Sequence, residues 1–124
     1  MVKEQSPLVA AMHLDRAVAS WDTGKDVICR SAPHLIIAHA HKADRTAPPA
    51  ATLALSYLEL AAPSFGLGCC WAGFFSVAAN VWPPMQKALD LPQGHIRFGA
   101  LMIGHPKYRY MRLPSRNQPV ITWR

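Results

Sequence analysis

The sequence predicts an α+β domain, and two kinds of apolar pattern carry that prediction. Residues 34–40 (HLIIAHA) and 96–104 (IRFGALMIG) are short apolar runs of the length and composition typical of buried strands. Between them, residues 50–62 are almost wholly Ala, Leu and Tyr, with polar residues only at helical spacing. A chain of 124 residues is long enough for one hydrophobic core and short for two domains. We therefore expect a single domain over residues 1–124, ending in a basic, extended tail over residues 105–124.

The composition indicates a globular chain with apolar surface to spare. Hydrophobic residues make up 51% of the sequence, and surplus apolar surface commonly forms a subunit interface. Met1 to Ser6 is polar without a signal-peptide pattern, and no apolar run is long enough to span a membrane. Three cysteines, Cys29 and the adjacent Cys69 and Cys70, make neither a disulfide framework nor a Cys-x-x-Cys metal pair. We expect reduced, buried thiols in a cytoplasmic protein.

The net charge of +6 comes entirely from the C-terminal part of the chain. Basic and acidic residues cancel over residues 1–90. Six basic residues follow without any acidic one: Arg97, Lys107, Arg109, Arg112, Arg116 and Arg124. Such a segment attracts anions, which leaves a cofactor phosphate, a nucleic acid or acidic groups on another chain as candidates. Only two tyrosines lie among the tail's central charges and no RNA- or DNA-binding motif is present, which argues against nucleic acid.

The first helix is expected from about Pro7 to Thr23. Ser6 suits the N-cap, proline suits the first helical position, and Gly24 is a typical C-terminal stop. Apolar residues recur on one face at helical spacing, among them Trp21, which we expect to anchor the core.

Two histidines mark the first strand. His39 and His41 are two residues apart, so they share one face of the sheet. A metal site needs further ligands, and none lies nearby in the sequence, so we expect no metal. In the second strand, Gly99 allows another part of the chain to approach closely.

The helix over residues 50–62 is apolar on most of its circumference. Its polar residues, Thr52, Ser56 and Glu59, form one narrow stripe. A helix of this kind is buried on most sides, and in a chain this small we expect it to pack partly against another subunit. An aspartate in place of Leu55 or Leu58 should then unfold or dissociate the protein, because burying an unpaired carboxylate is costly.

Residues 58–75 (LELAAPSFGLGCCWAGFF) contain the stretch around which the chain is organised. Gly66 and Gly68 permit a sharp turn and let the backbone pass close to a ligand or another part of the chain. A turn with little side-chain bulk, followed by Trp71, suits a planar ligand held by backbone groups, whereas the alternative is a glycine C-cap that leads into a buried strand. Beyond the turn we expect two short helices and a closing edge strand, over residues 74–81, 85–89 and 120–123.

No side-chain pattern for catalysis is visible. The sequence lacks a nucleophile elbow, a Walker motif and a dinucleotide-binding fingerprint. If the protein is an enzyme, a cofactor supplies the reactivity and the chain supplies binding and orientation, so no catalytic side chain is assigned.

Three blocks in the sequence resemble the C-terminal half of nitroreductase-family flavoproteins. They are APHLIIAHA, LELAAPSFGLGCCWAG and GALMIGHPKYRYMRLPSR, and they occur in the order found in that family. The similarity extends over about residues 21–123. It implies a three-layer α/β/α nitroreductase-like fold with the apolar helix in the core of a homodimer. It also implies FMN as cofactor, NAD(P)H as electron donor and a small-molecule electron acceptor.

The resemblance also assigns cofactor-binding residues. It implies that Trp71, Ala72 and Gly73 lie beside the isoalloxazine ring, where a backbone N–H would stabilise negative charge. It further implies that Arg112 and Arg116 hold the FMN phosphate, a role that suits the two-pronged guanidinium. Lys107 and Arg109 are weaker candidates, and the alternative for all four is a solvated basic tail.

One departure from the family limits the match. The family's N-terminal half contains an arginine-rich segment of the R-R-S-x-R kind, and this sequence has no counterpart, since Arg30-Ser31 aligns elsewhere. We therefore expect a partial domain that forms a homodimer or is complemented by an N-terminal half. The alternative function is a non-enzymatic dimeric binding or assembly module that kept the core and lost the cofactor.

Overall fold

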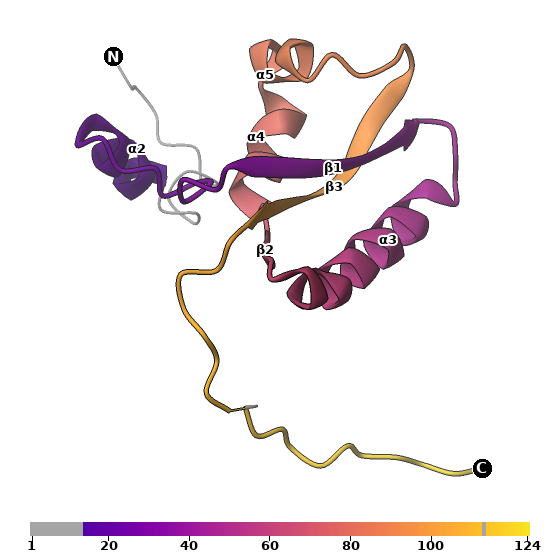
Figure 1. The fold of residues 1–124 in the computed structure, drawn as a ribbon. Helices are drawn as coiled ribbons and strands as arrows, with labels where there is room; N and C mark the ends of the chain where they lie inside the picture. The colour runs from indigo at the N-terminus through magenta and orange to yellow at the C-terminus, as the bar shows by residue number, and fades with distance from the viewer. Residues whose placement is uncertain (1–13, 113) are drawn as a thin grey trace.

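A three-stranded antiparallel sheet in the order β1-β3-β2 lies at the centre of the computed structural model, which describes residues 14–112 and 114–124. Helix α3 covers one face of the sheet and α4 with α5 covers the other, so the elements stack in three layers (Figure 1). In chain order the elements are α2 Leu14–Asp22, β1 His34–His41, α3 Ala47–Ala61, a 3-10 turn Ala62–Phe65, β2 Gly68–Trp71, α4 Gly73–Val81, α5 Pro83–Ala88 and β3 His95–Gly104. The α+β class and the three-layer arrangement expected from the sequence are confirmed.

The last strand in the sequence is the middle strand of the sheet. β3 pairs with the whole length of β1, from His34, which lies opposite Ile103, to His41. Its pairing with β2 begins at Gly68, which lies opposite Gly104. Successive residues of β3 face opposite layers. Ala100 and Met102 join the cluster under α4, while Leu101 faces α3 and is fully buried.

A β-bulge interrupts the β1–β3 pairing near its outer end. Ala38 is opposite Gly99 but His39 is opposite Arg97, so Phe98 is skipped. The extra residue reverses the alternation of side chains along β3 beyond this point. As a result, Arg97 joins Ala100 and Met102 on the α4 face, where an uninterrupted strand would have placed it on the α3 face.

Helix α3 packs on the sheet through a close contact with a glycine. Leu55 is 3% exposed, and a Cβ added to Gly99 would lie 2.7 Å from its Cδ1 atom. The opposite side of the helix is apolar and open, since Leu53, Tyr57 and Leu60 are 70%, 78% and 80% exposed. These three residues, four and three positions apart, form an exposed apolar stripe along α3.

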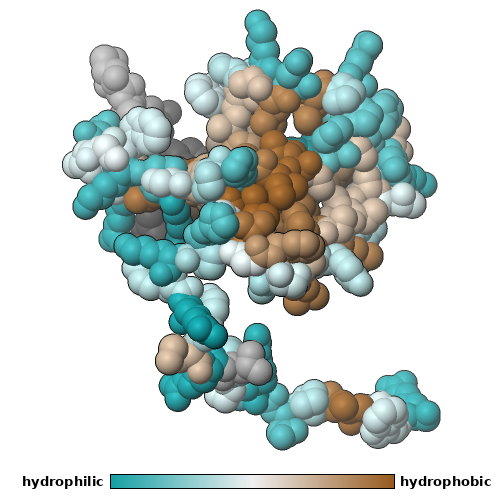
Figure 2. Space-filling view, in the orientation of Figure 1, coloured by the Kyte–Doolittle hydropathy of each residue, from teal (hydrophilic) through white to brown (hydrophobic). Residues whose placement is uncertain are grey.

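Apolar side chains also remain visible around the edge strand β1. The space-filling view has its largest apolar area near the middle of the molecule, where β1 crosses the sheet in Figure 1 (Figure 2). Leu35, Ile36 and Ile37 are only half-buried. A single copy of the described residues therefore leaves apolar surface uncovered on the sheet as well as on α3.

The positions of the helices follow from their prolines. The helix predicted over residues 50–62 begins earlier, at Ala47, because Pro48 and Pro49 fit its first turn. Likewise α5 begins at Pro83. The strand predictions for 34–40 and 96–104 and the helix predicted over 74–81 are confirmed within one residue. The start predicted for the first helix lies outside the described residues.

Three expectations from the sequence, two about burial and one about a strand, are wrong. Trp21 is 68% exposed, because α2 lies beside the sheet and not over it (Figure 1). Residues 120–123 form no strand, and Trp123 is 87% exposed. Cys70 is exposed on the edge strand, while Cys29 and Cys69 are half-buried, and all three are free thiols. Within the described part of the chain, every helix is too short or too polar to serve as a membrane span.

The contact between α3 and Gly99 gives a stability test. Gly99→Ala should lower the free energy of unfolding by about 1–3 kcal/mol, because the new methyl group collides with Leu55. Gly73→Ala is the matched control, since a Cβ there meets nothing within 4 Å. Urea unfolding followed by circular dichroism measures both. Equal unfolding midpoints for the two variants would contradict this account of the packing.

Candidate functional site

The candidate site is built on the turn that connects α3 to α4. The 3-10 turn after α3 ends at Gly66, whose φ of 70° is the left-handed conformation that favours glycine. The chain then enters β2, where a Cβ at Gly68 would lie 3.3 Å from the Pro106 ring. The two glycines thus act differently: Gly66 reverses the chain, and Gly68 lets the segment after β3 pass close by.

Trp71 ends β2 and is oriented by α3. Its ring N–H donates a hydrogen bond to Glu59 Oε2 at 3.0 Å, and its Cζ3 atom would lie 3.6 Å from a Cβ at Gly99. The side chain is 40% exposed. Trp71 therefore lies across the bare backbone of Gly99 with one part of the indole fixed and another part open to solvent.

Ala72 and Gly73 form the start of α4. Ala72 is 2% exposed, its N–H donates to the Ala100 carbonyl at 3.0 Å, and its carbonyl accepts the N–H of Ser76 at 2.9 Å. The N–H groups of the first helical turn have no acceptor within a helix, and no side chain caps this one. Because Gly73 is exposed and a Cβ there meets no atom, the start of α4 is open to a ligand.

A groove of about 870 Å³ runs beside this turn. Its lining combines the loop 29–33, the beginning of β2, the end of β3 and residues 105–110. Its basic side chains are Arg30, Lys107 and Arg109, and Glu59 is its one acidic side chain. The groove is therefore electropositive, and Glu59 belongs both to it and to the hydrogen bond that orients Trp71.

The loop wall of the groove is held by Asp26. Its carboxylate accepts hydrogen bonds from the N–H groups of Cys29 at 2.8 Å, Ile28 at 3.0 Å and Ser31 at 3.1 Å. These bonds, led by that from Cys29, lower the pKa of Asp26 below its ordinary value of 3.8. They also support Arg30 and Ser31 in left-handed backbone conformations, with φ of 54° and 57°.

Two of the three cysteines that line the groove, Cys29 and Cys69, have raised pKa values. Burial, and then the Asp26 charge, raise the pKa of Cys29. Burial and Glu59 do the same to the pKa of Cys69. A thiol needs a lowered pKa to react as a thiolate at neutral pH. The raised pKa values of Cys29 and Cys69 disfavour their thiolate forms, so the groove offers binding and orientation through its other groups.

The predicted phosphate ligands lie apart from the turn. Arg112 and Arg116 are exposed residues of the segment beyond β3, which runs away from the folded body (Figure 1). The structure thus brings Trp71, Ala72 and Gly73 together and does not bring the two arginines to them within one copy. The weaker candidates, Lys107 and Arg109, do line the groove.

The sequence pattern does not reveal two contacts, one at the site and one away from it. The polar stripe on α3 does not show that Glu59 bonds to Trp71, because a turn separates the two residues. At the far end of the sheet, His39 Nδ1 and His95 Nδ1 are 3.0 Å apart. Among residues 14–112 and 114–124, no three His, Cys, Asp or Glu side chains are grouped so that they could hold a metal ion.

The turn and groove fit a planar ligand with an anionic group. The open N–H groups at the start of α4 can donate to an electron-rich edge, and Trp71 offers an aromatic wall. The basic residues of the groove suit a negative charge.

Comparisons with known proteins agree with this geometry. The model of the nitroreductase family matches residues 2–105. The fold is similar to a crystal structure of a nitroreductase with bound FMN from Bacteroides fragilis, with a TM-score of 0.63 and 21% sequence identity. That match covers 77% of this chain and 52% of the other, so the chain spans about half the length of this relative. No curated protein sequence gives a significant match. With more than half of its residues matched by the family model, the chain belongs to the nitroreductase family.

Proposed function

We propose that this chain forms the C-terminal half of an FMN-dependent oxidoreductase site of the nitroreductase type, with NAD(P)H as electron donor and a small molecule as acceptor. The observation that carries the proposal is the open start of α4 at Ala72–Gly73, next to Trp71, with an electropositive groove lined by residues 66–70 of the same connection. FMN, when bound, would supply the hydride and electron chemistry, which agrees with the lack of a catalytic side-chain pattern.

The chain's own groups would bind and orient the flavin. The N–H groups at the start of α4, with the positive end of its dipole, stabilise negative charge that develops on a ligand edge. Trp71, fixed by Glu59, limits where a flat ring can lie. Both contributions are in place before a ligand arrives, so no reorganisation of the turn is required.

We further propose that Arg112 and Arg116 hold the phosphate of an FMN molecule bound by a second subunit. In one copy the tail leaves the folded body beyond the residues that line the groove (Figure 1), so its arginines can serve a site on a second subunit. Arginine is suited to this role because two parallel N–H groups can bond one phosphate.

The proposed assembly is a homodimer, or a complex with a separate N-terminal half. The exposed apolar stripe of Leu53, Tyr57 and Leu60 on α3 supports it, because a stripe of this kind is typical of an interface. The three free thiols support a reducing, cytoplasmic location.

A second candidate function is a non-enzymatic dimeric binding or assembly module. The observation that favours it is that neither Arg112 nor Arg116 lines the groove within one copy. The visible spectrum of the purified protein separates the two. Flavin bands, or their appearance after FMN is added, support the oxidoreductase, whereas a protein that stays colourless with FMN and an added N-terminal half supports the module.

The phosphate role of the tail can be tested with two flavins. Arg116→Ala should weaken FMN binding by roughly ten- to a hundredfold, because a charge-assisted hydrogen bond contributes about 1.5–3 kcal/mol. Riboflavin, which lacks the phosphate, should lose far less, and Lys107→Ala should affect FMN less than Arg116→Ala does. Fluorescence quenching of each flavin measures the affinities. An equal loss for FMN and riboflavin would show that Arg116 is not a phosphate ligand.

The dimer can be tested on the outer side of α3. Leu53→Asp or Leu60→Asp should dissociate the protein while leaving its helical content, because a carboxylate buried without a partner costs several kcal/mol. Thr52→Asp is the control on the same helix, since Thr52 is already polar and exposed. Sedimentation velocity at micromolar concentration, together with circular dichroism, gives both readouts. A folded parent protein that sediments as a monomer would contradict the proposed homodimer.

A further inference from the structure

A second cavity, of about 290 Å³, lies at the end of the sheet far from Trp71. It is bounded by β3, the second half of α4, α5 and the loop before β3. None of its eleven lining residues is acidic. Its polar side chains are those of Asn80, Gln86, Gln93, His95 and Arg97.

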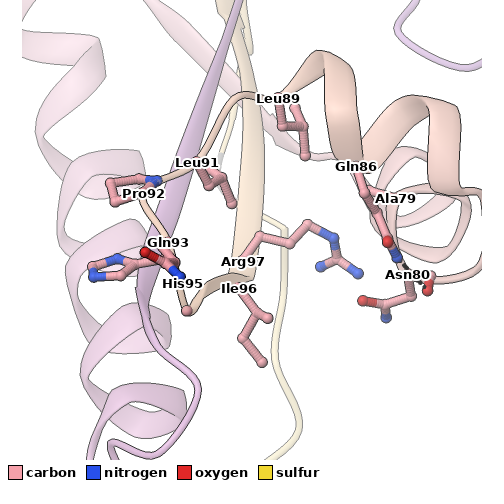
Figure 3. A pocket seen from close by; sticks show the side chains of 11 residues that line it. Ala79, Asn80, Gln86, Leu89, Leu91, Pro92, Gln93, His95, Ile96 and Arg97 are labelled. Carbon is pink, nitrogen blue, oxygen red and sulfur yellow. Dashed lines mark hydrogen bonds between the residues drawn. The ribbon is translucent and has the colours of Figure 1, made fainter.

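Arg97 is the charged group of this cavity and is only partly satisfied. Its side chain extends from β3 toward the helix that carries Ala79 and Asn80 (Figure 3). One terminal N–H donates to the Ser76 carbonyl, while Nε is buried without a hydrogen-bond partner among the described residues. Burial also lowers the pKa of Arg97. A half-buried guanidinium without an acidic neighbour is unfavourable unless an anion pairs with its charge and accepts its hydrogen bonds.

The rest of the lining limits the kind of anion. Leu89 and Leu91 supply apolar walls, and Gln86 is fixed by a 2.9 Å hydrogen bond from its side-chain N–H to the Asn80 carbonyl. A phosphate dianion would need a second full charge, and the only other titratable group in the lining is His95. A planar carboxylate matches one guanidinium fork, and the volume is near the lower end of ligand pockets, about 300 Å³.

We propose that this cavity binds a small organic carboxylate, with the carboxylate on the Arg97 guanidinium and the apolar body against Leu89 and Leu91. The site is separate from the start of α4 and does not depend on FMN. The β-bulge at Phe98 is what creates it, because the bulge turns Arg97 onto the α4 face.

Benzoate and benzamide provide a matched test on the full-length chain. They share a ring, and only benzoate carries the charge that Arg97 requires. Titration followed by ¹H–¹⁵N NMR should show benzoate shifting the amide signals of Ser76, Asn80 and Arg97 with a millimolar or tighter dissociation constant. Benzamide and inorganic phosphate should each bind at least about tenfold more weakly. Arg97→Gln should remove the benzoate response, and Arg45→Gln, at an exposed arginine, should keep it.

A second variant covers the case in which Arg97→Gln fails to fold. Arg97→Lys keeps the charge and loses the planar fork, so it should weaken benzoate by about tenfold. The proposal is overturned if benzoate shifts no signals of the parent chain, if phosphate binds as tightly as benzoate, or if the shifts centre on Trp71–Gly73. If benzoate has no effect and Arg97→Gln changes the oligomeric state, the proposal is also overturned, because a carboxylate of another subunit then fills the cavity.

Discussion

The contact of Leu55 with the bare backbone of Gly99 is the constraint on which the rest of the structure depends. It brings α3 against the middle strand of the sheet, and that strand pairs with both of its neighbours. Trp71 covers the same glycine and is held by Glu59 from α3. The position of α3, the pairing of β2 and the orientation of the site's aromatic residue therefore depend on one close approach.

Helix α4 connects the two chemically distinct ends of the sheet. Its first residues follow Trp71 and carry open backbone donors, and the electropositive groove is lined by residues 66–70 just before them. Its second half borders the cavity of Arg97, and the Ser76 carbonyl in between accepts a bond from that side chain. A helix of nine residues thus gives a backbone-based site at one end and a side-chain-based site at the other.

Local patterns predicted what is local in this protein. The strands and the helix after Pro49 were recognised because periodic apolar runs report burial over many residues, and Trp71, Ala72 and Gly73 are consecutive in the sequence. Trp21 was misjudged because an apolar residue is buried only if another element lies opposite it, which periodicity does not reveal. The sequence shows Arg97 only as one of the basic residues of the C-terminal part, since its place in a cavity depends on a bulge in strand pairing.

The place of β3 in the sheet has a consequence for how the protein is made. Among the described residues it is the last strand to be synthesised and the one to which both others pair, with His34 opposite Ile103. Until residues 95–104 leave the ribosome, β1 and β2 lack this partner, and non-local pairing of this kind is slow. During that interval the nascent chain exposes unpaired strand edges, which are the surfaces through which partly folded chains associate with one another.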